Sequence, residues 1–307
     1  VSNLVYIFGG EDCTGACANL SSVLTYNPAT NDYLAKRDMP TARHAMAVGV
    51  INGIIHLAGG YLDGAGGGPY AAHEAYNPFF NTWSAPAPLP TARGAAGGAV
   101  VNGKFFAIGG WDDVSALSRN DAYDPLTNAW TPRAPMPTPR LLWGASVVNG
   151  LVYAIGGADG SFTSVSAVES YDPGADAWSV RAAMPSPRGW LSFAVLNDRI
   201  YAIGGLDALG AAVNAVEEYT PATDTWVPKT GLQFGRMGTG AAAANGKAYV
   251  FGGLGWFISE EGTLVASCDS PKLVWSVTYM ATVTPSDTAL GVAVSGGSVF
   301  VAGSLIK

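Results

Sequence analysis

The chain has 307 residues, of which 13% are charged, 49% are hydrophobic and 40 are glycine, and its formal net charge is −7. An acidic chain so poor in charge lacks the basic surface of a nucleic-acid-binding protein, and its apolar content argues against general disorder. Because glycine at this level weakens helices, the composition favours a turn-rich, all-β protein. No apolar run reaches the roughly 18 residues of a membrane-spanning helix.

The first predicted element is a strand over the apolar residues 5–8, and no signal peptide with a charged n-region precedes it. Cys13 and Cys17 lie in the loop that follows, and Cys268 is the third cysteine. Cys13 and Cys17 could form a bridge in an oxidising compartment, and whether they do stays open. The compartment is not determined, with a secreted or periplasmic location slightly favoured over a cytoplasmic one.

A unit of about 49 residues then repeats along the chain. Each unit has an apolar run that ends in Gly-Gly, then a tyrosine, a tryptophan seven residues later in most copies, and an arginine that leads a strand of small residues. The Gly-Gly pairs begin at Gly9, Gly59, Gly109, Gly156, Gly204 and Gly252. Turns such as Asn102-Gly103 between apolar runs predict hairpins. Each unit therefore predicts four short antiparallel strands, and the units must stack to bury both sheet faces.

The Gly-Gly pair, the tyrosine, the tryptophan and the arginine together resemble the kelch repeat, over essentially the whole chain. The resemblance implies a β-propeller, and it extends distantly to bacterial kelch sialic-acid mutarotases. Six periods separate Gly10 from Gly303. We therefore predict an all-β, six-bladed kelch-type propeller with four antiparallel strands per blade, as one domain over residues 1–307.

The predicted strands number one more than six such blades need. We expect residues 288–295 to close the ring as the inner strand of the N-terminal blade. One of the two end strands is then displaced, added to an edge, or paired with another chain, and the sequence does not choose among these.

Strand polarity places the arginines and the loops after Gly-Gly on one face, around the mouth of the central channel. The arginines are Arg43, Arg93, Arg140, Arg188 and Arg236, and Asp287 occupies the sixth position. A ring of arginines would suit an anionic ligand. The alternative is that acids two residues before the blade tyrosines hold them; these are Glu74, Asp121, Glu169 and Glu217.

Aromatic residues outside the repeat positions map to the same face, and we predict that they bind a sugar, an aromatic ring or a peptide. They are Tyr61, Tyr70, Trp111, Trp143, Trp190 and Trp256. For Trp143 and Trp190, packing between blades is the alternative interpretation.

Acids that do not recur from unit to unit are the candidates for general acid–base catalysis. They are Asp113, Glu260, Glu261 and Asp287. Asp112, Asp159 and Asp207 recur after Gly-Gly and indicate turns instead. We expect no metal, because His44 and His73 should lie too far apart to share one. No phosphate-binding or hydrolase motif is present, so no cofactor is expected.

Three function classes follow. The first is a ligand-recognition propeller that binds a small or extended ligand, anionic, carbohydrate or aromatic, at the arginine- and tryptophan-lined mouth. The second is a cofactor-free isomerase, mutarotase or cyclase that uses a carboxylate and an arginine there. The third is a protein–protein interaction scaffold. The expected partner is a small molecule, glycan or peptide, and not a nucleic acid; the oligomeric state stays open.

Overall fold

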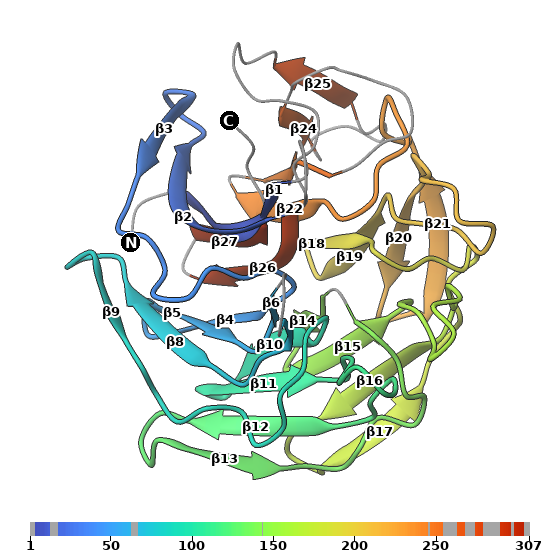
Figure 1. Ribbon diagram of the computed structural model, residues 1–307. Helices are drawn as coiled ribbons and strands as arrows, with labels where there is room; N and C mark the ends of the chain where they lie inside the picture. Colours follow the sequence, from blue (N-terminus) through green and yellow to red (C-terminus); the bar gives the residue numbers. More distant parts are fainter. Residues whose placement is uncertain are drawn as a thin grey trace.

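The computed structural model describes residues 4–12, 18–62, 67–142, 144–244 and 246–253, and the backbone of four later strands at 263–267, 274–278, 289–295 and 298–303. These residues form sheets arranged around a central axis, so that the fold is an all-β propeller (Figure 1). Within this part of the chain, no helix is long and apolar enough to cross a membrane.

Five of the sheets are four-stranded antiparallel blades, which we number 1 to 5 in chain order. Blade 1 contains β4 (Ala47–Ile51), β5 (Ile54–Ala58), β8 (His73–Asn77) and β9 (Thr82–Ser84). Blade 2 contains β10 (Gly97–Val101), β11 (Lys104–Ile108), β12 (Asn120–Asp124) and β13 (Ala129–Pro132). In both, the first strand lies nearest the axis and the last at the periphery (Figure 1).

The other three blades repeat this order. Blade 3 contains β14 (Ser146–Val148), β15 (Leu151–Ile155), β16 (Val168–Asp172) and β17 (Ala177–Val180). Blade 4 contains β18 (Ser192–Leu196), β19 (Arg199–Ile203), β20 (Val216–Thr220) and β21 (Thr225–Lys229). Blade 5 contains β22 (Gly240–Ala244), β23 (Lys247–Phe251), β24 (Thr263–Ser267) and β25 (Val274–Thr278). A two-stranded ribbon of β6 (Tyr61–Leu62) and β7 (Gly68–Pro69) interrupts the β5–β8 connection of blade 1.

The two chain ends meet in a different sheet, which we call the closing sheet. It contains β1 (Val5–Asp12), β2 (Ala18–Asn27), β3 (Asp32–Ala35), β26 (Ala289–Ser295) and β27 (Ser298–Gly303). Its strand order is β26-β27-β1-β2-β3, and β27 is antiparallel to β26 but parallel to β1.

The prediction of a six-bladed propeller of four-stranded blades is therefore wrong. Among the described strands only five sheets are such blades, and the closing sheet has five strands and a parallel pair. β26 takes the innermost place expected for residues 288–295, but β27 separates it from β1. Repeat spacing could not show this, because β26 and β27 pair with each other as antiparallel neighbours and either of them could present a strand edge to β1.

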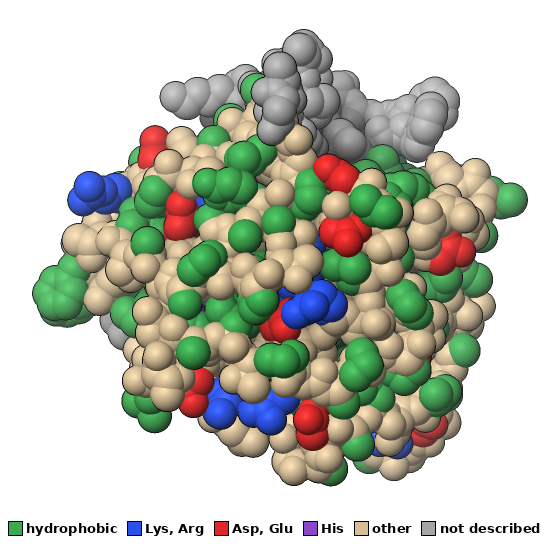
Figure 2. Space-filling view, turned by 60° about the horizontal axis from the view of Figure 1, so that its bottom comes forward, with side chains coloured by type: hydrophobic (Ala, Val, Ile, Leu, Met, Phe, Trp, Pro, Cys, Tyr) green, Lys and Arg blue, Asp and Glu red, His purple; other side chains and the backbone are tan. Residues whose placement is uncertain are grey.

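Aromatic side chains fill the interfaces between neighbouring sheets. The ring of Phe8 in β1 lies 5.8 Å from that of Tyr76 and 5.9 Å from that of Trp83, both of blade 1. Since both faces of each sheet are covered in this way, the sequence needs few charges, and charged side chains stand singly or in small groups among hydrophobic ones on the surface in view in Figure 2.

Repeated hydrogen bonds also join the outer turns of successive blades. In blade 3, Tyr171 Oη donates to Asp176 Oδ1 at 2.6 Å, and Ala134 N, from the segment that leaves blade 2, donates to the same oxygen at 2.9 Å. Trp178 Nε1 donates to Ala134 O at 2.8 Å. The residues that correspond to Asp176 in blades 1, 2 and 4 are Asn81, Asn128 and Asp224. The repeat tryptophan thus binds the linking segment directly, and the tyrosine does so through Asp176.

Candidate functional site

Four of the five arginines expected at the channel mouth are fully buried, with 0% exposure. Each forms an ion pair with an acid of its own blade: Arg43 with Glu74 at 2.5 Å, Arg93 with Asp121 at 2.8 Å, Arg140 with Glu169 at 2.7 Å and Arg188 with Glu217 at 2.7 Å. The acids two residues before the blade tyrosines therefore hold them. Because a fully buried guanidinium cannot touch an external ligand, these four arginines do not enter the candidate site.

Each of these arginines also connects two blades through its backbone. Arg140 O accepts a hydrogen bond from Gly110 N of blade 2 at 3.0 Å, while its guanidinium donates to Ala154 O of blade 3 at 3.1 Å. Burial lowers the pKa of Arg140 from its ordinary value, and Glu169 opposes that shift. The arginine is therefore a structural link between blades.

Arg236 differs from the other four because it is only partly buried. Its guanidinium donates to Gly252 O at 2.7 Å. In blade 4 the acid Glu217 is the register partner of Ala202. In blade 5 Val250 takes the place of Ala202, and its register partner is Leu264 instead of an acid. The carboxylate position of the repeat is thus not preserved in blade 5.

Aromatic residues gather on the mouth face in what we call the rim cluster, made of Tyr61, Trp111 and Trp190. These three partly buried side chains pack against a floor of four buried residues, namely Ala45, Ala95, Leu141 and Ala158. Tyr61 Oη donates to Trp111 O at 3.1 Å. The ring of Phe162, which is 54% exposed, lies 4.9 Å from that of Trp111 and extends the cluster.

The repeat itself positions the rim cluster. In blades 1 to 4, the residue after the arginine forms a backbone bridge with the residue after the Gly-Gly pair of the same blade, as in His44 with Tyr61 and Gly94 with Trp111. A Cβ on Gly94 would come within 2.2 Å of the Tyr61 ring, so this glycine makes room for the ring to lie over the next blade. The aromatic residues of blades 1 and 2 are thereby brought into contact.

Trp190 has an unusual backbone conformation at the rim. Its φ is 54°, close to the 53° of Ala45 and the 50° of Ala95, which hold the equivalent positions. A hydrogen bond from Gly238 N to Trp190 O, 2.8 Å long, links blade 5 to blade 4, as Ala95 N links blade 2 to Ala45 O. Left-handed conformations are rare for bulky residues. Because Ala45 and Ala95 share this conformation, it belongs to the repeat, and the repeat fixes the place of Trp190 in the rim cluster.

The loops after Gly-Gly carry the remaining described candidates. Tyr70 is 37% exposed. Asp113 is exposed, and its φ is 72°. The burial of Tyr61 and, after it, the negative charge of Asp113 raise the pKa of Tyr61 above its ordinary value. Asp112 Oδ1 accepts hydrogen bonds from Val114 N and Ser115 N, which confirms its predicted role in a turn. The candidates Trp143, Trp256, Glu260, Glu261 and Asp287 lie outside the described residues.

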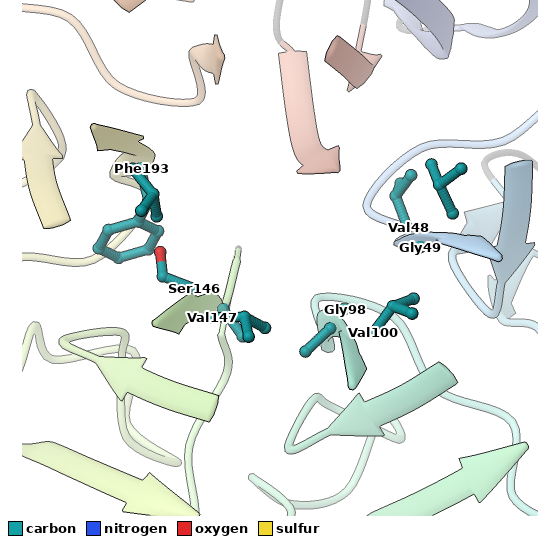
Figure 3. A pocket seen from close by; sticks show the side chains of 11 residues that line it. Val48, Gly49, Gly98, Val100, Ser146, Val147 and Phe193 are labelled. Carbon is teal, nitrogen blue, oxygen red and sulfur yellow. The ribbon is translucent and has the colours of Figure 1, made fainter. Parts of the chain in front are cut away.

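A cavity of about 280 Å³, which we call the channel cavity, lies between the inner strands of blades 1 to 4. Its lining residues are Val48, Gly49, Val50, Gly98, Ala99, Val100, Ala145, Ser146, Val147, Phe193 and Val195. Side chains from four blades surround this space (Figure 3). Val50, Val100, Val147 and Val195 each lie seven residues after their blade's arginine. Sequence reasoning missed this valine ring, although that spacing was a readable signal.

The histidines do not form a common site. His44 Nδ1 lies 2.9 Å from Asn19 Oδ1, while His73 Nε2 lies 2.9 Å from His56 Nδ1 inside blade 1. Within the described residues, no group of three or more His, Cys, Asp or Glu side chains is arranged to hold a metal ion.

Comparisons with known proteins agree with this architecture. The kelch motif matches residues 92–137, 139–185 and 191–233. A solved structure titled "Structure of YjhT" aligns with a TM-score of 0.72 and 16% sequence identity, over 87% of this chain and 96% of that chain. No curated protein matches the chain. At this identity the likeness to YjhT shows the fold alone.

Proposed function

Since the kelch motif matches three successive repeats of the chain, we propose that the channel mouth recognises an uncharged ligand with flat apolar faces, a carbohydrate or an aromatic group, through the rim cluster. The observation that carries this proposal is the packing of Tyr61, Trp111 and Trp190 against one apolar floor. Aromatic side chains offer a large apolar face, and tyrosine and tryptophan add a polar handle.

The electrostatics of the mouth favour an uncharged ligand over an anionic one. Four of the arginines that an anion would need are buried in ion pairs. Asp112, Asp159 and Asp207, from the same face, accept backbone hydrogen bonds within their own turns. Few charged groups of either sign remain to select the ligand, so its shape and its apolar faces must do so.

Titration with neutral sugars, followed by tryptophan fluorescence, tests the proposal. We expect Trp111→Ala and Trp190→Ala each to weaken binding about tenfold or more, because each removes a central contact. Phe79→Ala is the matched control, since Phe79 is 78% exposed in the outer turn of blade 1. Unchanged affinity in both tryptophan variants would exclude the rim cluster as the site.

A cofactor-free isomerase is the second candidate, and Asp113 supports it. The carboxylate of this exposed residue lies near the Tyr61 phenol, so an acid and a hydroxyl share the mouth. Exchange between sugar anomers, measured by NMR, should accelerate with the wild-type protein and lose that acceleration in Asp113→Asn. Equal exchange rates with and without the protein would leave ligand recognition as the function.

A further inference from the structure

The channel cavity continues inward from the rim cluster along the same chain segments. Trp190 precedes the cavity residue Phe193 by three positions, and Ala45 precedes Val48 by the same interval. At no more than about 3.3 Å per residue, three positions span at most about 10 Å. The rim and the cavity are therefore adjacent levels of one channel.

The lining of the cavity is chemically uniform. Among the lining residues that the structure describes, only Ser146 has a polar side chain atom, and the others are valine, alanine, glycine and phenylalanine. Val100, Val147 and Val195 are partly exposed to this space, although they lie on inner strands. Since a cavity of about 150 Å³ can hold a benzene molecule, about 280 Å³ holds a larger apolar group.

We propose that the channel cavity binds an aliphatic chain of the ligand whose head group occupies the rim cluster. The proposal rests on the proposed function, and it identifies the ligand class as amphipathic, with an uncharged head and a short hydrocarbon tail. Two observations support the tail: the ring of four valines, and the position of the cavity directly below the aromatic rim.

A series of alkyl β-glucosides with methyl, butyl and hexyl chains, kept below their micellar concentrations, tests the proposal by calorimetry. We expect affinity to rise roughly three- to fourfold for each methylene group that enters the cavity. Val100→Phe, which fills the cavity, should abolish this rise and leave methyl glucoside binding unchanged. Val180→Phe is the matched control, because Val180 is 77% exposed on the outer strand β17.

A second measurement does not depend on whether Val100→Phe folds. In the wild-type protein, 1-hexanol should shift the methyl NMR signals of Val100 and Val147, and not that of Val180. If methyl glucoside binds and chain length has no effect, the tail site is wrong while rim recognition stands. If no glucoside binds but 1-hexanol shifts the valine signals, the rim proposal fails and the cavity binds only a free apolar molecule.

Discussion

At the residue scale, the arginine of each repeat is the most consequential polar side chain. Arg140 is fully buried between Glu169 and the carbonyl of Ala154, and its own carbonyl accepts a hydrogen bond from the preceding blade. Removing one partner of a buried ion pair costs far more than removing an exposed pair, because the remaining charge stays in a poorly solvated site.

We therefore expect Arg140→Ala to lower the free energy of unfolding by about 3–5 kcal/mol, measured in urea. The double variant Arg140→Met/Glu169→Gln should recover much of this loss, since it buries no lone charge. Lys104→Ala is the control, because it breaks the partly exposed Lys104–Asp124 pair and should change stability little. Equal losses in Arg140→Ala and Lys104→Ala would contradict the buried ion-pair role.

His56 and His73 are a second residue-scale feature, specific to blade 1. They lie 5% and 2% exposed against Phe105, Tyr123 and other aromatic rings of blade 2. Burial lowers the pKa of His56 to about 4 and that of His73 to about 3. In the hydrogen-bonded pair, His73 Nδ1 donates to Ala87 O, which leaves its Nε2 to accept from His56 Nδ1. Both rings are therefore neutral in the folded protein.

The pair makes stability depend on pH in a defined direction. In the unfolded chain both histidines take up protons below about pH 6.5, but in the folded protein they resist protonation until about pH 4 or below. Stability is therefore complete above pH 6.5 and falls on acidification, by on the order of 3 kcal/mol per histidine. Thermal unfolding between pH 7 and 4 should show this fall.

The variant His56→Phe/His73→Val provides the comparison, since Phe106 and Val168 occupy the equivalent positions in blades 2 and 3. It should have a shallower dependence of stability on pH across the same range. An unchanged slope would mean that other groups cause the acid sensitivity.

At the scale of the elements, the outer turn of each of blades 1 to 4 binds the segment that enters the blade. Asp176 accepts from both Tyr171 Oη and Ala134 N, and its φ is 50°, a conformation that asparagine and aspartate tolerate well. This double role explains why the same position holds only Asn or Asp in blades 1 to 4.

Tyr171→Phe removes one hydrogen bond and should cost about 1 kcal/mol of stability. Asp176→Ala should cost more, about 1–3 kcal/mol, because it removes both hydrogen bonds and adds backbone strain. Asp176→Asn keeps the acceptor oxygen and should be nearly neutral in chemical denaturation. A loss in Asp176→Asn as large as that in Asp176→Ala would mean that charge, rather than the acceptor, is required.

At the scale of the whole molecule, the ring is closed by pairing the two ends of the chain. β27 lies between β26 and β1, and Val5 is the register partner of Val299. Val294 in β26 pairs with Val299 from the other side and is therefore two strands away from Val5. Adjacent strands lie about 4.8 Å apart, within the range of a disulfide, whereas two strand spacings are about 9.6 Å.

In a variant whose three native cysteines are replaced by serine, Val5→Cys/Val299→Cys should cross-link rapidly with oxidised glutathione. Val5→Cys/Val294→Cys should cross-link slowly or not at all, as judged by mass spectrometry of the digested protein. The reverse ranking would place β26 beside β1, the arrangement expected from the sequence.

Several elements were predictable from the sequence because their causes are local. The Gly-Gly pairs, the Asn-Gly turns and the spaced tyrosine and tryptophan define one blade, and repetition of the blade requires a propeller. The sequence also selected Tyr61, Trp111 and Trp190, because they depart from the repeat, and the structure brings these three into one cluster. The ligand that they recognise stays a proposal.

Other features depended on contacts between distant segments, which spacing does not specify. The repeat arginines could face solvent or an acid of their blade, and both outcomes fit the same sequence. The direction of each side chain across the blade decides between them, and it pairs Arg43, Arg93, Arg140 and Arg188 with acids. The valine ring requires four blades to surround one axis.

The charged content of 13% and the repeated motifs by themselves determined a charge-poor, stacked all-β architecture, because each blade must bury both of its faces. Only the tertiary structure decided that five blades are regular and that the closing sheet has five strands, because a strand edge can pair with any edge that reaches it.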